Sequence, residues 1–228
     1  MKSQQAIGAL SLTKIPRACR LVVLISGSGT NLQAIIDACD SGVLPVEVTT
    51  VISNERDAYG LNRARAANIP ARTLDHRAFA HRADFDRELK TLIDSYKPNL
   101  LVLAGFMRVL GEEFVRHFLG RTMNIHPSLL PNYPGLNTHA RALADGATEH
   151  GATVHFVTTE LDGGPQIVQK QISVRPDDTP GSLAGRVHQI EHEIYPRAIG
   201  WFAEGRLFMK GNRAFLDDMP INVWQGIL

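Results

Sequence analysis

The chain has few cysteines and no long apolar segment. Cys19 and Cys39 are the only cysteines among 228 residues, which excludes a disulfide framework and is typical of proteins from a reducing compartment. No stretch reaches the roughly 20 consecutive apolar residues that a membrane-spanning helix needs. We therefore expect a cytoplasmic protein that has no membrane partner.

An excess of charge of either sign is also absent. The 24 Lys and Arg residues nearly balance the 23 Asp and Glu residues, so the formal net charge is +1. A nucleic-acid-binding domain usually carries a strongly basic surface. The balance therefore predicts no nucleic-acid partner, although it still allows a local basic pocket.

The length is that of one compact domain. A chain of 228 residues with 44% hydrophobic residues can bury one substantial core. Residues 1–20 contain basic residues but no acidic one, and we interpret them as a flexible N-terminal extension, with a transit peptide as the alternative. Residues 21–228 are then expected to form a single domain, as a monomer or a homodimer.

Hydrophobic periodicity predicts alternating strands and helices in the first half of the chain. Residues 21–25 are a continuous apolar run that ends in Ser-Gly-Ser-Gly, the pattern of a strand buried on both faces and closed by a sharp turn. Further strands are expected over 46–52, 71–74, 100–104 and 122–125, with helices over 30–41, 58–67 and 84–96. This alternation predicts an α/β fold, with a mostly parallel, twisted sheet and helices on both faces.

The second half has a different pattern. Residues 153–157 and 167–174 alternate apolar and polar side chains on either side of a glycine-rich turn, which predicts antiparallel or mixed strands. A long helix is expected over about 181–202, because an apolar stripe runs along it, and a short strand over 206–209.

The first candidate site is the segment Ser26-Gly27-Ser28-Gly29-Thr30-Asn31. Glycines between a strand and a helix let the backbone approach an anion, and the helix N-terminus offers unpaired N–H groups. Leu32 replaces the third glycine of a dinucleotide fingerprint, and the Lys-Ser/Thr pair of a P-loop is missing. The segment therefore favours a monophosphate, with an ordinary strand-to-helix turn as the alternative.

The second candidate site is Asn124-Ile125-His126-Pro127 and the residues that follow it. Asn124 and His126 are two positions apart on a predicted strand, so their side chains leave the same side of the carboxyl end, where α/β sheets bind ligands. An amide and an imidazole that converge there can stabilise an oxyanion. The alternative is a strand-end histidine with a local hydrogen bond.

The third candidate is Asp162, in the segment Leu161-Asp162-Gly163-Gly164-Pro165. An aspartate in such a segment usually forms a turn by hydrogen bonding to its own backbone. If Asp162 lies beside His126, its charge would favour the imidazolium, and the carboxylate could accept a proton directly or through water.

Six motifs follow one another along the chain: GSGTN, LAGFMRVL, NIHPSLLP, YPGL, HGATVHFV and LDGGP. In this order they resemble the phosphoribosylglycinamide formyltransferase family, from about residue 21 to beyond residue 209. The resemblance implies a Rossmann-like formyltransferase fold, with a mononucleotide-binding half at about 21–125 and a folate-binding C-terminal half at about 126–228. It also implies transfer of the formyl group of 10-formyltetrahydrofolate to the amine of glycinamide ribonucleotide, which gives formylglycinamide ribonucleotide and tetrahydrofolate in de novo purine synthesis.

The resemblance implies roles for individual residues. The phosphate of the ribonucleotide would be held by Gly29, Thr30 and Asn31, and its ribose hydroxyls by Glu191. The residues implied to bind the formyl donor are Arg82, Met107, Arg108, Val109, Leu110 and Asn124, and the implied catalytic residues are Asn124, His126 and Asp162. No metal is expected.

Three further features come with the resemblance. The segment 133–136, Tyr-Pro-Gly-Leu, looks like a loop over the folate site. His188 and Asn137 depart from some relatives, which have glutamine and histidine at these positions, and we expect the departures to affect substrate contacts more than chemistry.

In the implied mechanism, the amine of the ribonucleotide attacks the formyl carbon within two adjoining sites. Asn124 and protonated His126 would stabilise the tetrahedral oxyanion. Asp162 would keep His126 charged and help to move the proton from the attacking amine to the departing folate nitrogen, through water.

Other functions remain open. Residues 188–192 read His-Gln-Ile-Glu-His and match the H-x-x-E-H pattern of one metalloprotease group, although core packing also explains this helix. Formyl transfer to initiator methionyl-tRNA and hydrolysis of formyltetrahydrofolate resemble the same catalytic core, but either enzyme would be expected to carry an extra domain. A catalytically inactive binding module is a further alternative.

Overall fold

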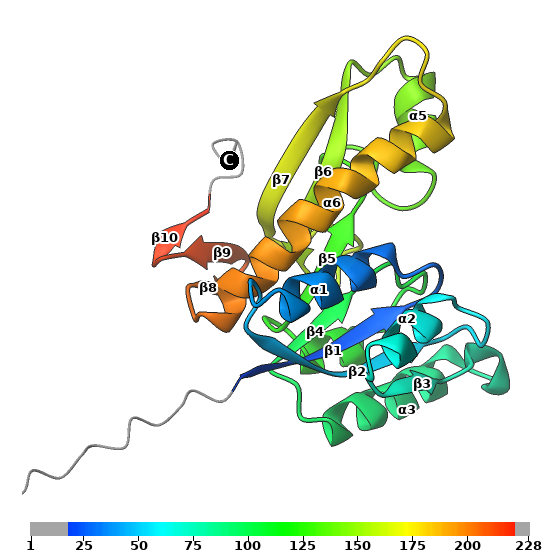
Figure 1. The fold of residues 1–228 in the computed structure, drawn as a ribbon, viewed down its shortest axis with the longest axis vertical. Coiled ribbons are helices and arrows are strands. Elements are labelled where there is room, and N and C mark those ends of the chain that lie inside the picture. The colour runs from blue at the N-terminus through cyan, green and yellow to red at the C-terminus, as the bar shows by residue number, and fades with distance from the viewer. Residues whose placement is uncertain (1–17, 222–228) are drawn as a thin grey trace, which may run out of the picture.

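The chain folds around a seven-stranded sheet. The computed structural model describes residues 18–221. The strands lie in the order β3-β2-β1-β4-β5-β6-β7 (Figure 1), and their bounds are β1 Cys19–Ile25, β2 Val46–Ser53, β3 Ala71–Thr73, β4 Leu100–Leu103, β5 Thr122–His126, β6 Glu149–Phe156 and β7 Gln166–Ser173. Strands β1 to β5 are parallel, whereas β6 pairs antiparallel with β5 and with β7.

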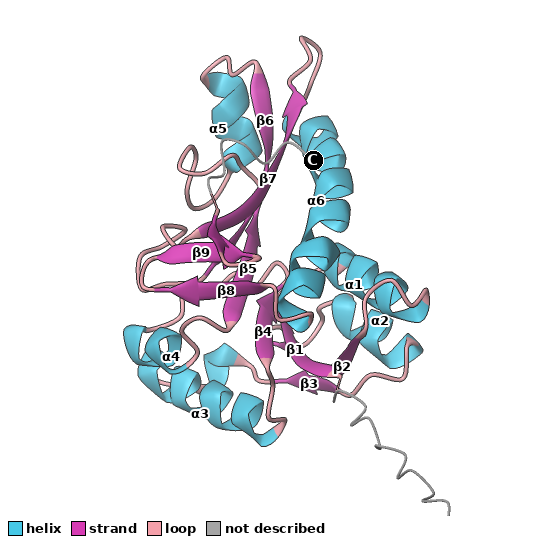
Figure 2. Ribbon diagram, turned by 90° about the vertical axis from the view of Figure 1, so that its left-hand side faces the viewer, coloured by secondary structure: helices cyan, strands magenta, loops and turns pink. Residues whose placement is uncertain are grey.

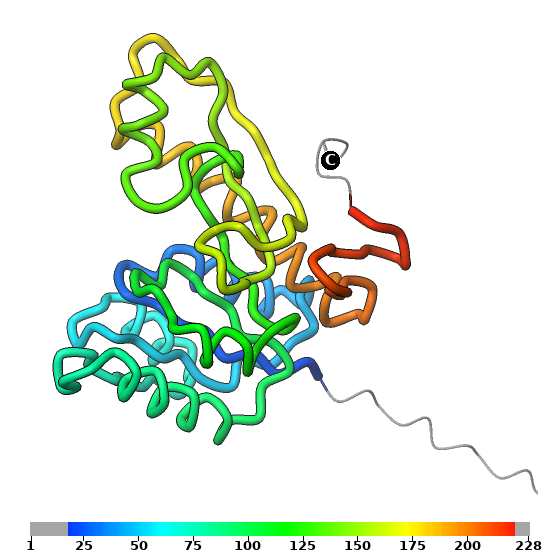
Figure 3. Tube along the Cα trace, turned by 180° about the vertical axis from the view of Figure 1, so that it is seen from behind, coloured from blue at the N-terminus to red at the C-terminus, as the bar shows by residue number. Residues whose placement is uncertain are grey.

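Helices cover both faces of this sheet (Figure 2). One face carries α1 (Thr30–Asp40), α2 (Gly60–Ala66) and α6 (Pro180–Ala203), and the other carries α3 (Arg82–Ser95) and α4 (Glu112–His117). A further short helix, α5 (Thr138–Ala144), packs against α6. β6, β7 and α5 extend beyond the parallel part of the sheet (Figure 3), and α6 contacts both parts, since it packs on β6 and β7 as well as on α1.

The alternation of side chains along β1 explains the two layers of helices. Leu21, Val23 and Ile25 belong to the core cluster that includes α1 and α6, whereas Val22 and Leu24 belong to the cluster that includes α3. Because successive side chains of a strand point to opposite faces, an unbroken apolar strand must be covered on both sides. The sheet and its helices therefore confirm the predicted α/β fold with helices on both faces.

The first strand begins earlier than predicted. Cys19 and Arg20, which the sequence analysis assigned to the N-terminal extension, pair with Val46 and Glu47 of β2. Arg20 also forms a salt bridge with Glu47, at 3.1 Å, so cross-strand pairing extends the strand beyond its apolar part. The rest of the predicted extension, residues 1–17, lies outside the described residues.

The sequence analysis missed two short α-helices, a 3-10 helix over His76–Ala78 and part of a second sheet. α4 has only six residues, and α5 buries only Thr138 and Ala142, so neither helix shows the stripe of large apolar side chains that identifies an amphipathic helix. The strand expected over 206–209 is β8 (Leu207–Lys210), and it forms an antiparallel sheet with β9 (Arg213–Leu216) and β10 (Met219–Pro220). Within residues 18–221, no helix combines the length and apolar character that crossing a bilayer requires.

Candidate active site

The structure brings the three predicted catalytic residues into one cluster. Asn124 and His126 stand at the carboxyl end of β5, and Asp162 comes from the loop between β6 and β7. Oδ2 of Asp162 lies 3.5 Å from Nδ1 of His126. Oδ1 of the same carboxylate lies 3.8 Å from Nε2 of His155, which in turn lies 3.1 Å from Nδ2 of Asn124. Asp162 therefore faces the two histidines, and the second of them contacts Asn124.

His155, on β6, is a site residue that the sequence analysis did not single out. It pairs directly with Asn124 across the antiparallel strands. Its Nδ1 lies 2.9 Å from the carbonyl oxygen of Phe156, and because a carbonyl can only accept, Nδ1 carries the proton. In the neutral ring Nε2 is then an acceptor, and it receives a hydrogen bond from the amide of Asn124.

The burial of His155 agrees with this assignment. Burial lowers the pKa of His155 below its ordinary value, against the opposing effects of the Phe156 carbonyl and of Asp162. The contact at 3.8 Å between Nε2 of His155 and Asp162 is therefore not an ion pair, since the unprotonated nitrogen carries no charge. His155 acts on Asn124 instead, by fixing the direction of its amide group.

The loop 133–136 lies against two of the predicted catalytic residues. Nε2 of His126 is 2.9 Å from the carbonyl oxygen of Tyr133 and therefore donates to it. The backbone N–H of Gly135 donates to Oδ2 of Asp162, at 2.8 Å. Both side chains are almost fully buried, with 7% of His126 and 8% of Asp162 exposed. The segment that the sequence analysis interpreted as a loop over the site thus contacts two of the three predicted catalytic residues.

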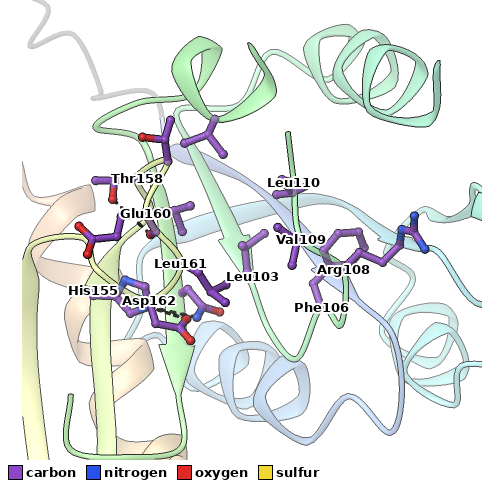
Figure 4. Close-up of a pocket in the computed structure, with 14 residues that line it drawn as sticks. Leu103, Phe106, Arg108, Val109, Leu110, His155, Thr158, Glu160, Leu161 and Asp162 are labelled. Atoms are coloured by element: carbon purple, nitrogen blue, oxygen red, sulfur yellow. Dashed lines mark hydrogen bonds and ion pairs between the residues drawn. The ribbon is translucent and has the colours of Figure 1, made fainter. Parts of the chain in front are cut away.

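A cavity opens beside this cluster (Figure 4). The polar residues that line it include Asn124, His155 and Asp162. Apolar side chains of β4, of the segment 106–110 and of the loop 157–161 also line it. Several large apolar side chains around it are exposed, including Val109 at 55% and Leu161 at 60%. Exposed apolar groups around a cavity with a few convergent polar groups are typical of a small-molecule site.

The residues predicted to bind the formyl donor take different positions. Val109, Leu110 and Asn124 line this cavity. Arg108 also lines it, but its guanidinium is directed away from His155 and Asp162 (Figure 4) and lies 5.2 Å from the centre of the Phe85 ring. Arg82, the first residue of α3, lines a second cavity between α3 and α4.

Met107 stands apart from these residues. The residue is 68% exposed, and its backbone N–H donates to Oγ of Ser26 at 2.7 Å. The hydroxyl of Ser26 itself donates to Asn54. Ser26 thereby joins the start of the glycine-rich segment to the segment that carries Val109 and Leu110.

The glycine-rich segment 26–31 ends at the N-terminus of α1. Gly29 is the N-cap, with a left-handed φ of 71°, and no side chain caps the helix. The N–H groups of the first turn therefore have no side-chain partner at the cap, as an anion site requires. Thr30 and Asn31 are the first two residues of this helix, so the predicted phosphate-binding residues stand together at its start.

Gly60, at the start of α2, packs directly on this segment. A Cβ on Gly29 would lie 2.6 Å from Cα of Gly60, and a Cβ on Gly60 would lie 2.5 Å from Cδ1 of Ile25 and 3.1 Å from Cα of Gly29. The N–H of Gly60 donates to the carbonyl of Gly27, at 3.0 Å. Arg63, one turn further along α2, donates through Nε to the carbonyl of Ser28, at 2.8 Å. Contacts from α2 thus hold the segment in place, a function that the sequence did not indicate.

Gly60→Ala is expected to displace the glycine-rich segment. Overpacking of this kind typically costs about 1–3 kcal/mol, and we expect a loss of that size in the free energy of unfolding, together with weaker binding of a phosphate-bearing ligand. Urea unfolding and ligand titration measure the two effects. Gly185→Ala is the matched control, because a Cβ there meets nothing within 4 Å; an equal loss in both variants would contradict the close contact.

Glu191, on α6, also contacts the glycine-rich segment. Its Oε2 accepts a hydrogen bond from Nδ2 of Asn31, at 2.8 Å, and 3% of the residue is exposed. Burial raises the pKa of Glu191 above its ordinary value, against the opposing effects of the Asn31 hydrogen bond and of His188. Oδ1 of Asn31 is buried without a hydrogen-bond partner. The structure thus joins the residue predicted to bind ribose to one predicted to bind phosphate.

The histidines of the H-x-x-E-H pattern are stacked on α6. The rings of His188 and His192 lie 6.3 Å apart with an angle of 8° between their planes, while the glutamate of the pattern, Glu191, is bound to Asn31. In the part of the chain that the structure describes, no group of three or more His, Cys, Asp and Glu residues could hold a metal ion. The two cysteines are unpaired, and burial raises the pKa of both thiols, that of Cys39 to about 11.

Comparison with known proteins shows similarity to formyl transferases. The formyl transferase family model matches residues 19–199. The phosphoribosylglycinamide formyltransferase of Escherichia coli is 55% identical over 197 residues, which cover 86% of this chain and 93% of that protein.

Two solved structures have the same fold. The phosphoribosylglycinamide formyltransferase of Coxiella burnetii is 56% identical, with a TM-score of 0.87, over 90% of this chain and 97% of that one. The glycinamide ribonucleotide transformylase 1 of Symbiobacterium toebii is 45% identical, with a TM-score of 0.87, over 91% and 98%. The chain therefore belongs to the formyl transferase family and, within it, to the phosphoribosylglycinamide formyltransferases.

Proposed function

We propose that this protein transfers the formyl group of 10-formyltetrahydrofolate to the amine of glycinamide ribonucleotide, in de novo purine synthesis. One observation carries the proposal. Asn124, His126 and Asp162 form one cluster, and Asn124 and Asp162 also line the apolar cavity. The cavity would take the heterocycle of the donor, which supplies the formyl group. The start of α1 and Glu191 would take the phosphate and the ribose of the acceptor.

The polar groups of the cluster suit acyl transfer. When an amine adds to the formyl carbon, negative charge develops on the formyl oxygen, and the amine nitrogen becomes positively charged. The amide of Asn124 donates one N–H to His155, which leaves the second N–H for the formyl oxygen. Asp162 faces Nδ1 of His126 with its negative charge, at 3.5 Å, and this arrangement stabilises a protonated imidazole as the second donor.

Asp162 also suits the proton transfer. The attacking amine must lose a proton and the departing folate nitrogen must gain one, so the two steps balance. A carboxylate with 8% of its side chain exposed can accept the first proton, directly or through one water, and return it to the leaving nitrogen. Asp162 therefore acts both on the charge of His126 and on the path of the proton.

The loop over the site must exchange its contacts during this reaction. His126 donates through Nε2 to the carbonyl of Tyr133, and Asp162 accepts from the N–H of Gly135. Donation from His126 to the formyl oxygen replaces the first bond, and acceptance of a proton by Asp162 weakens the second. The two contacts pair these buried polar groups within the protein.

One assay distinguishes this function from its alternatives. Loss of 10-formyltetrahydrofolate is followed by absorbance with and without glycinamide ribonucleotide, and the formylated product is identified by mass spectrometry. We expect consumption only with the acceptor. Consumption without it would point to a hydrolase, and absence of consumption in both arms to an inactive binding module.

The hydrogen bond from Asn124 to His155 has a measurable consequence. His155→Ala leaves the amide of Asn124 without the acceptor that fixes its direction. We therefore expect kcat to fall roughly tenfold, which corresponds to about 1.4 kcal/mol of barrier. His155→Gln keeps an acceptor and is expected to retain more of the activity. Equal kcat values for the wild type and for His155→Ala would contradict the role of His155.

The remaining expectations concern the whole protein. We propose a cytoplasmic enzyme that acts on small molecules, without a nucleic-acid partner, as a monomer or a homodimer. The first half, about 21–125, would bind the nucleotide. The second half, about 126–228, would contribute the loop 133–136 and the strands beside the donor. Size-exclusion chromatography with light scattering determines the oligomeric state.

A further inference from the structure

We propose that Asp86, on α3, is a positioning residue that fixes the segment 107–111 and the two arginines beside it for binding of the formyl donor. The inference rests on the proposed function, because it assigns the donor to this segment. Asp86 lies outside the catalytic cluster, among the residues that line the second cavity, between α3 and α4.

The first support is a buried hydrogen bond. Oδ2 of Asp86 accepts from the backbone N–H of Gly111, at 2.8 Å, and 7% of Asp86 is exposed. Gly111 follows directly on Leu110 and is the N-cap of α4. The carboxylate thus fixes the end of the segment that carries Val109 and Leu110 into the donor cavity.

The second support is the space at Gly111. A Cβ added there would lie 2.7 Å from Oδ2 of Asp86, which is closer than van der Waals contact allows. The φ of Gly111 is −72°, an ordinary value for any residue. Close approach of the carboxylate, and not the backbone conformation, is therefore what favours glycine at this position.

The third support is the position of two guanidinium groups. Nε of Arg82 lies 3.9 Å from Oδ2 of Asp86. Arg108 packs over the ring of Phe85, the neighbour of Asp86 in the chain, at 5.2 Å. Burial raises the pKa of Asp86, while the Gly111 hydrogen bond and the charges of Arg82 and Arg108 oppose the rise. The aspartate therefore pairs with Arg82, and Arg108, the second arginine that the family resemblance assigns to the donor, packs on its neighbour Phe85.

One oxygen of the carboxylate has no partner. Oδ1 of Asp86 is buried and makes no hydrogen bond, although leaving a buried acceptor unpaired is costly. Arg82 is the cation with a printed contact to this carboxylate, at 3.9 Å from its other oxygen, and it is therefore the group placed to hydrogen bond to Oδ1.

The experiment compares donor binding with catalysis. Asp86→Ala removes both the hydrogen bond to Gly111 and the charge, whereas Asp86→Asn can keep an acceptor for Gly111 and removes only the charge. Asp84→Asn, on the same helix, is the control, since its carboxylate is 43% exposed and pairs with Arg87. Steady-state kinetics give kcat and both KM values, and fluorescence titration with tetrahydrofolate gives a Kd that needs no turnover.

We expect Asp86→Ala to raise the KM for 10-formyltetrahydrofolate and the Kd for tetrahydrofolate about tenfold, or about 1.4 kcal/mol. The value of kcat and the KM for the ribonucleotide should stay within about twofold, with Asp86→Asn intermediate and Asp84→Asn like the wild type. A fall in kcat alone, or a rise in both KM values, would overturn the inference. If Asp86→Ala does not fold, Asp86→Asn decides by the same criteria.

The two proposals fail in different ways. If the wild type transfers no formyl group but binds tetrahydrofolate, the proposed function is wrong, and the Kd values of the Asp86 variants still test the inference. If the wild type is active and the variants bind tetrahydrofolate normally, only the role of Asp86 is wrong.

Discussion

Asp162→Asn is expected to lower kcat for formyl transfer by about 10²–10⁴-fold, with much smaller changes in the two KM values. Asparagine has nearly the same size and can still accept the N–H of Gly135, so the loop over the site keeps its contact. It lacks the negative charge that faces His126 at 3.5 Å, and it cannot take up the proton of the attacking amine. Stopped-flow measurement of a single turnover tests the effect on the chemical step.

A matched variant shows whether the loss belongs to the site. Asp218 is also an aspartate with a left-handed backbone, at φ 63° against 52° for Asp162, but it is exposed, in the turn between β9 and β10. Asp218→Asn is expected to keep the wild-type rate. A rate for Asp162→Asn close to that of Asp218→Asn would remove Asp162 from the mechanism.

Asn124→Ala is expected to lower kcat by about 10²–10³-fold, which corresponds to about 2.7–4 kcal/mol for the loss of one oxyanion donor. The side chain of Asn124 emerges from β5 at the rim of the donor cavity, and His155 fixes its direction. Because the donated hydrogen bond strengthens as charge develops on the formyl oxygen, the effect should fall on kcat more than on either KM.

Two further variants separate donation from packing. Asn124→Asp keeps the size of the side chain but replaces the donor with a negative charge, so we expect a loss at least as large as with alanine. Asn212→Ala, in the exposed turn between β8 and β9, should leave kcat unchanged. Substantial activity in Asn124→Asp would contradict the assignment of an N–H donor at this position.

Much of the fold follows from local patterns in the sequence. The apolar run before Ser26 predicted a doubly covered strand, and the core clusters on its two sides confirm it. That the side chains of Asn124 and His126 leave the same side of β5 followed from the two-residue period of a strand. That Asp162 lies beside His126 followed only from the family resemblance. The short helices α4 and α5 carry no periodic apolar signal, because α4 has only six residues and α5 buries only Thr138 and Ala142.

The missing parts of the site depend on contacts between distant residues. His155 lies in an apolar strand, so the sequence alone gives it the look of a core residue. Its partner Asn124 is 31 positions away, and no local pattern indicates this contact. The bond from His126 to Tyr133 involves a backbone carbonyl, which no side-chain pattern can indicate. The packing of Arg108 over Phe85 likewise arises only when α3 lies beside the segment 107–111.

The central claim is that Asn124 and Asp162 act, with His126, on one reacting carbon. A double-mutant cycle on kcat, with Asn124→Ala, Asp162→Asn and the combined variant, tests it most directly. If the two groups serve the same transition state, the combined loss will be clearly smaller than the product of the single losses. A combined loss equal to that product would mean that the two residues act independently, and it would contradict the account.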